Sequence, residues 1–137
     1  MTVPLNDLVT LASEAVYTGE WQPAFTPTAH LVEIDADSVT QAADLFANAT
    51  AALELPEDAA IRKWSGFEDR LWESISTSER EVVVIVLRHA DALLAGQLAV
   101  LLEAVSVFTA IAHGFADRSS DPKSVFIVLT GAGPNFP

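Results

Sequence analysis

The sequence of 137 residues contains no cysteine. This absence excludes disulfide bonds, cysteine metal sites and a thiol nucleophile, and it leads us to expect a cytoplasmic protein. The N-terminus has no basic segment followed by an apolar run, so we expect no signal peptide. The most apolar stretch, residues 98–115, contains Glu103 and ends in a His-Gly pair. It therefore favours a buried helix of a soluble protein over a membrane span.

Basic residues are also scarce. The chain has seven Lys and Arg and nineteen Asp and Glu, which gives a net charge of −12. Residues 1–78 contain thirteen acidic and three basic side chains, and residues 79–137 contain six and four. Such a chain repels nucleic acid and anionic membranes, so we expect neither as a partner. The asymmetry suggests an acidic N-terminal part and a nearly neutral, apolar C-terminal part with different roles.

Side chains with the spacing of a catalytic or metal site are not recognisable. The serines have no paired base, and the alternating oxygen ligands of a calcium loop are absent. The acidic pairs at residues 57–58 and 68–69 are interpreted as a solvated helix face, and Trp21, Trp64 and Trp72 as core or interface anchors. We therefore predict no catalytic residue and no metal ligand.

Residues 1–76 are predicted to be mainly helical. Asn6 or Asp7 can cap a helix that ends near Gly19, and a capping-box pattern at residues 38–41 precedes a second helix. A third helix is expected after it, broken or bent at the Ser65-Gly66 pair. The full prediction for this part is a helix at 8–19, a loop at 20–28, a short strand at 30–34 and helices at 39–55 and 61–76.

Residues 77–137 have a different pattern, with an apolar, β-branched run at 82–87. This run favours a strand buried on both faces, although a buried helix is an alternative that periodicity cannot exclude. Asp91 can cap one long helix to His113, with Gly114 just past its end, and residues 125–130 form another apolar strand. Strand, helix and strand predict a parallel crossover unit, in which the segments around residues 85 and 127 lie side by side.

The "LTGAG" turn after the last strand can bring backbone N–H groups close to a ligand. By itself it is a weak signal. A dinucleotide-binding turn would require glycine where Phe136 stands, and a sirtuin-type turn has a similar sequence but normally opens its domain.

A longer segment, "EVVVIVLRHADALLAGQLAVLLEAVSVFTAIAHGFADRSSDPKSVFIVLTGAGPNF", resembles the opening unit of the crotonase (enoyl-CoA hydratase/isomerase) superfamily. Residues 82–87 match the family's first strand, and Ala92-Leu93 match the loop behind it. Ala90 and Leu94 stand where the family usually has Pro and Asn. The resemblance implies an α/β chain: a helical N-terminal region, residues 1–76, followed by a crotonase-like βαβ unit, residues 77–137, in a fold that is possibly incomplete.

The same resemblance implies acyl-CoA chemistry of the lyase or isomerase type, in which backbone N–H groups stabilise a thioester enolate. Coenzyme A would be part of the substrate, so no cofactor is expected. The resemblance places CoA near His89, Asp91, Ala92 and Leu93, and it makes Gly131, Gly133 and Phe136 the approach to an oxyanion hole whose donors lie beyond the last residue. The chain alone would then be inactive.

The apolar strand at residues 125–129 needs cover on both faces and neighbours on both edges. We therefore expect a completing chain or a homo-oligomer. The alternative function, from a different class, is a non-catalytic interaction domain that binds a protein partner through its apolar sheet and long helix.

Overall fold

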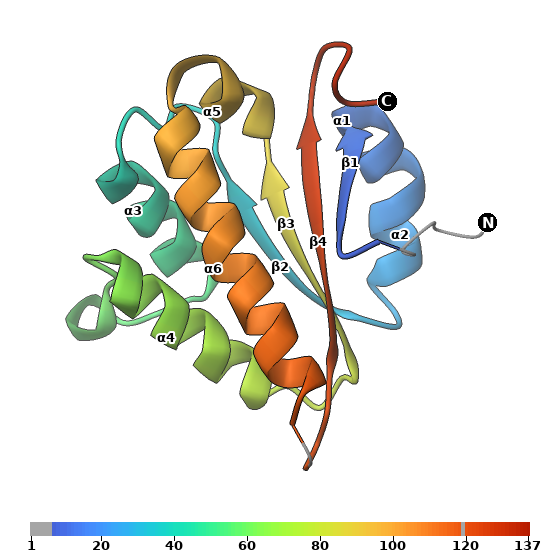
Figure 1. Ribbon diagram of the computed structural model, residues 1–137, viewed down its shortest axis with the longest axis vertical. Coiled ribbons are helices and arrows are strands. Elements are labelled where there is room, and N and C mark those ends of the chain that lie inside the picture. Colours follow the sequence, from blue (N-terminus) through green and yellow to red (C-terminus); the bar gives the residue numbers. More distant parts are fainter. Residues whose placement is uncertain (1–6, 119) are drawn as a thin grey trace.

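The computed structural model describes residues 7–118 and 120–137. Within this part of the chain, four parallel strands form one sheet in the order β1-β4-β3-β2 (Figure 1). The strands are β1 (Val9–Ser13), β2 (His30–Asp35), β3 (Val82–Arg88) and β4 (Ser124–Gly131). The architecture is therefore α/β with a parallel sheet, as the sequence predicts.

Helices connect the strands on both faces of the sheet. Between β1 and β2 lie α1 (Glu14–Val16), the π-helical turn η1 (Tyr17–Trp21) and α2 (Gln22–Phe25). The remaining connections contain α3 (Ala42–Ala52), the 3₁₀ turn η2 (Glu57–Ala59), α4 (Trp64–Ser76), α5 (Ala90–Gly96) and α6 (Leu98–Ala116).

The two central strands are built as their sequences predict. Ile85 of β3 lies opposite Ile127 of β4 in a parallel ladder, which confirms the predicted side-by-side strands and excludes the helix alternative. The residues from Val83 to Leu87 are all buried. Each such side chain gains roughly 1.5–3 kcal/mol on full burial, and β-branched residues suit a strand packed on both faces.

Alternate residues of β3 enter two different cores. Val83, Ile85 and Leu87 belong to the larger core under α3, α4, α5 and α6. Val84 and Val86 belong to a smaller core on the opposite face, where η1 supplies Tyr17 and Trp21 and α2 supplies Phe25. Figure 1 shows these two helical layers on either side of the sheet.

The predicted helix at residues 8–19 is wrong for the described residues, because Val9–Ser13 form a strand and the helix begins at Glu14. The ladder with β4 outweighs local helix propensity here. The predicted capping residue Asn6 lies outside the described residues. The predicted loop at 20–28 is also wrong in part, since η1 and α2 occupy it, and Pro23 stands in the first turn of α2, where proline is tolerated.

Three further predictions about where helices are interrupted or end are wrong. The break predicted at Ser65-Gly66 does not occur, because α4 runs without interruption from Trp64 to Ser76. The single long helix predicted after Asp91 is divided at Gln97, whose backbone (φ −141°, ψ 55°) is not helical. Gly114 does not follow the end of α6 but lies inside its last turn.

The capping box predicted at residues 38–41 is not formed. Helix α3 begins only at Ala42, its N-cap residue Gln41 makes no side-chain cap, and Ser38 has a positive φ of 66°. Instead Asp44 accepts the backbone N–H of Thr40 at 2.9 Å and its hydroxyl at 2.8 Å.

The chain itself supplies the neighbours that β4 requires, with β1 on one edge and β3 on the other. Residues 1–76 and residues 77–137 each contribute two strands to this one sheet. The physical argument for a completing chain or an oligomer therefore no longer holds. By length and composition α6 could cross a membrane, but seven of its residues are buried against the core, as expected for a core helix.

Candidate functional site

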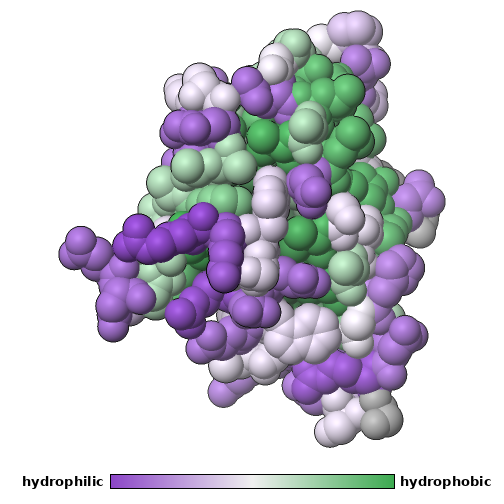
Figure 2. All heavy atoms as spheres, turned by 60° about the vertical axis from the view of Figure 1, so that its left-hand side comes forward, coloured by the Kyte–Doolittle hydropathy of each residue, from purple (hydrophilic) through white to green (hydrophobic). Residues whose placement is uncertain are grey.

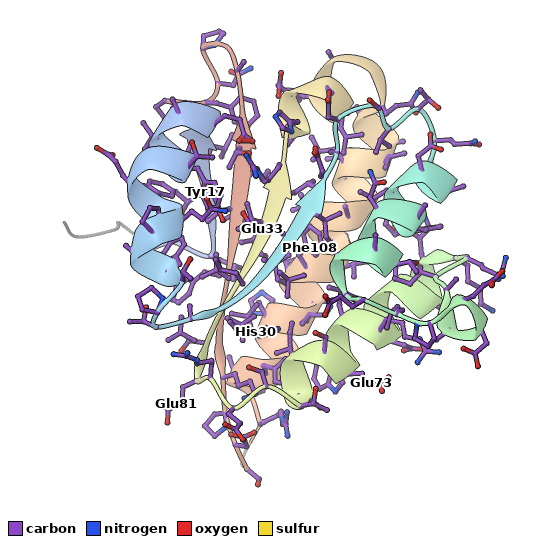
Figure 3. All side chains as sticks on the ribbon, turned by 180° about the vertical axis from the view of Figure 1, so that it is seen from behind. Tyr17, His30, Glu33, Glu73, Glu81 and Phe108 are labelled. Carbon is purple, nitrogen blue, oxygen red and sulfur yellow. The ribbon has the colours of Figure 1, made fainter. Side chains whose placement is uncertain are left out.

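Helix α4 has an apolar face that packs inward and an acidic face that points outward. Phe67, Leu71 and Ile75, four residues apart, are fully buried in the larger core. The outer face carries Glu68, Asp69, Trp72 and Glu73, all exposed, and we call these four residues the acidic ridge. Figure 3 shows Glu73 on the outer side of α4. Figure 2 views the molecule from the side that lies on the left in Figure 1, and hydrophilic side chains are prominent in the left and lower parts of that view.

Trp72 is the apolar member of the ridge, and its side chain is held in place by α6. Its rings stack on Phe115, with centroids 4.1 Å apart and an interplanar angle of 26°. The residue is nevertheless 37% exposed. The ridge therefore presents a fixed, partly exposed indole among carboxylates.

The carboxylates of the ridge are largely available to a partner. Arg70 approaches Glu73, with 3.3 Å between Nη1 and Oε2, but both side chains are well exposed, and such pairs are worth about 0–1 kcal/mol. The loop before α4 adds the exposed Glu57 and Asp58 of η2 and its flanking residue Glu54, although Arg62 and Lys63 also precede the helix.

This arrangement of an exposed indole and carboxylates resembles a binding surface. Among residues 7–118 and 120–137, no group of three or more His, Asp and Glu side chains could hold a metal ion. Aromatic side chains framed by charges are typical anchors of protein–protein interfaces. The ridge therefore fits a protein partner with a basic surface.

Another polar cluster lies at the carboxyl ends of the strands. Arg88 donates to Glu14 through Nε (3.2 Å to Oε1) and Nη2 (3.1 Å to Oε2), and Thr130 donates to Glu14 Oε1 at 2.6 Å. His89 Nδ1 lies 2.8 Å from Asp35 Oδ1, and its Nε2 lies 3.6 Å from Glu14 Oε1. We call these five residues the edge cluster. It joins the segment before β2 to β2, β3 and β4.

The charges of the edge cluster stabilise one another. The hydrogen bond to Asp35, and then the charge of Glu14, raise the pKa of His89 above its ordinary value, although partial burial opposes this. Partial burial alone would raise the pKa of Glu14, but hydrogen bonds from Arg88 and Thr130 outweigh it and hold that pKa below its ordinary value. The cluster satisfies its own members, which indicates a structural role.

The structure brings two of the residues predicted to bind CoA, His89 and Asp91, close to the turn predicted as the approach to an oxyanion hole. His89, the N-cap of α5, has a left-handed backbone (φ 58°), and its N–H donates to Thr130. A side chain at Gly131 would collide with Asp91 and Phe136, so these three residues are in contact. Gly133 lies in the following turn with φ 101°.

The other two residues predicted to bind CoA, Ala92 and Leu93, differ in burial. Leu93 is buried in the larger core, whereas Ala92 is exposed on α5.

Sequence reasoning did not identify the acidic ridge as a site. It interpreted residues 68–69 as a solvated face and Trp72 as a core or interface anchor. The available signal was a Trp within one helical turn of carboxylates, with apolar residues at the spacing of the opposite face.

Comparison with known proteins supports a different family from crotonase. No match was found among curated proteins or solved structures. A family model described as "Barstar (barnase inhibitor)" matches residues 29–128, well over half of the chain. The match includes β2, α3, η2, α4, β3, α5, α6 and most of β4, whereas β1, α1, η1 and α2 precede it.

The crotonase assignment is therefore wrong, and with it the acyl-CoA partner and the lyase or isomerase activity. The predicted βαβ unit is present, but a strand, a helix and a strand with a glycine turn are common to many α/β folds. The extent of the match shows that the chain belongs to the barstar (barnase inhibitor) family.

Proposed function

We propose that this chain is a non-catalytic protein inhibitor of a barnase-type ribonuclease and that it binds the enzyme through the acidic ridge. The observation that carries the proposal is the position of the ridge: exposed carboxylates and Trp72 lie on α4, inside the segment that matches the family. This function belongs to the interaction class that the sequence left as an alternative.

The charge of the chain supports such a partner. A ribonuclease must attract an RNA polyanion, so its active site presents cationic side chains. A protein of net charge −12 is drawn to the same surface, and carboxylates placed opposite those cations compete directly with phosphates. Inhibition then needs no chemistry from the chain, only occupation of the site.

Trp72 supplies the apolar part of the proposed interface. Truncation of anchor residues at interface centres commonly costs 2 kcal/mol or more, and tryptophan is enriched among them. The 37% of Trp72 that is exposed would become buried in the complex. A cytoplasmic location and the lack of a cofactor remain part of this proposal.

The test is inhibition of RNA cleavage by barnase and direct titration of the complex. We expect Asp69→Asn and Glu73→Gln each to weaken inhibition at least tenfold, because a desolvated charge pair typically costs 2–5 kcal/mol when one partner is removed. Glu20→Gln is the matched control, since Glu20 is also exposed but lies in η1, outside α4 and the family match. Absence of inhibition by the unaltered chain at micromolar concentration would overturn the proposal.

A further inference from the structure

We propose that Gly114 of α6 is a positioning residue, which fixes the orientation of Trp72 in the acidic ridge. This inference rests on the proposed function, because it assigns Gly114 a role in the binding of the ribonuclease. It starts from an anomaly in the sequence: glycine lies inside the last turn of α6, where it is less favourable than alanine.

The backbone conformation does not explain this glycine. Among the described glycines only Gly133 has a positive φ, so alanine could adopt the backbone of Gly114 without strain. The surrounding space does explain it. A Cβ added at Gly114 would lie 2.7 Å from Trp72 Cζ3 and 2.9 Å from Trp72 Cη2, closer than real Cβ atoms approach other atoms.

Both colliding atoms belong to the six-membered ring of the indole. That ring therefore lies directly against the backbone of α6 while the side chain stacks on the neighbouring Phe115. Since Trp72 is partly exposed, it can move outward if a methyl group is added at Gly114. The expected consequence of Gly114→Ala is a displaced indole in a folded protein.

A displaced indole matters for binding because a partner recognises an anchor in one orientation. An anchor that is already held in its bound position loses little conformational freedom on association. Gly114 and Phe115 thus hold Trp72 in one orientation on the helix that also carries Asp69 and Glu73.

The experiment compares Gly114→Ala with Gly96→Ala, a matched glycine substitution at the end of α5, where an added Cβ meets no described atom within 4 Å. The indole N–H resonances of the three tryptophans are recorded by NMR, and Trp72→Phe identifies that of Trp72. We expect Gly114→Ala to move the Trp72 resonance and to leave the other two in place, while Gly96→Ala moves none of them.

Titration with barnase gives the functional readout. We expect Gly114→Ala to bind roughly tenfold more weakly, as for the loss of an interface anchor, and Gly96→Ala to bind normally. In a Trp72→Phe background, which lacks the two colliding atoms, Gly114→Ala should cause no further loss. This cycle separates positioning of Trp72 from a general effect on α6.

The outcomes distinguish the inference from the function on which it rests. An unchanged Trp72 resonance in Gly114→Ala would overturn the positioning role, whether or not barnase binds. A moved resonance with unchanged affinity, in a chain that Glu73→Gln weakens, would overturn the link between Gly114 and binding and leave the proposed function intact. Failure of the unaltered chain to bind barnase would overturn both claims about binding.

Discussion

Removal of the His89 imidazole should make the stability of the protein less dependent on pH near neutrality. His89 lies between two carboxylates, Asp35 at 2.8 Å and Glu14 at 3.6 Å, which come from β2 and from α1. Asp37 also favours the imidazolium, whereas Arg88 is the neighbouring cation. The protonated ring therefore ties the segment before β2 to the rest of the sheet.

The sign follows from the pKa of His89, which folding raises above its ordinary value near 6.5. Stabilisation by the charged ring is fully present below the ordinary pKa and is lost as pH rises through the raised, folded value. The side chain of His89 is 37% exposed, so solvent screens both pairs. Exposed pairs contribute about 0–1 kcal/mol each, so we expect His89→Gln to cost about 1 kcal/mol at pH 5.5 and close to nothing at pH 9.

Urea unfolding at several pH values measures this difference, with Asp35→Asn and the double variant completing a mutant cycle. The coupling energy between His89 and Asp35 should fall as pH increases. A cost of His89→Gln that is the same at pH 5.5 and pH 9, or larger at pH 9, would refute the reasoning, because the ring would then act through packing and not through its charge.

The remaining predictions concern the segment that precedes the family match. Removal of residues 1–28 would uncover the face of the sheet that contains Val84 and Val128, so the truncated chain should aggregate in light scattering, and a stable monomer would contradict the assigned second core. Tyr17 donates to Glu33 at 2.7 Å (Figure 3), and burial together with this hydrogen bond raises its pKa, so absorbance titration should show the phenol still protonated above pH 10. Ionisation of this tyrosine at its ordinary pKa would show that the contact is not maintained in solution.

The central strands could be predicted from local sequence, whereas the edge strand β1 could not. The β-branched run of β3 favoured a buried strand over the helix alternative, and the structure confirms the strand. In contrast, Val9–Ser13 is a short mixed segment that is stable as a strand only because β4 lies beside it. The same explanation applies to η1 and α2, which are held by packing of Tyr17 and Phe25 and not by a strong helical pattern.

The proposed site likewise depends partly on local sequence and partly on tertiary packing. By itself the sequence determined an acidic, cysteine-free α/β chain with parallel central strands, because composition and β-branching act locally. It could not show that Trp72 stacks on Phe115 while staying partly exposed, or that Gly114 lies under the indole, because both depend on how α4 packs against α6. Trp72 and Gly114 are more than forty positions apart and meet only when α4 and α6 pack together, and so the tertiary structure alone decided how the acidic ridge is formed.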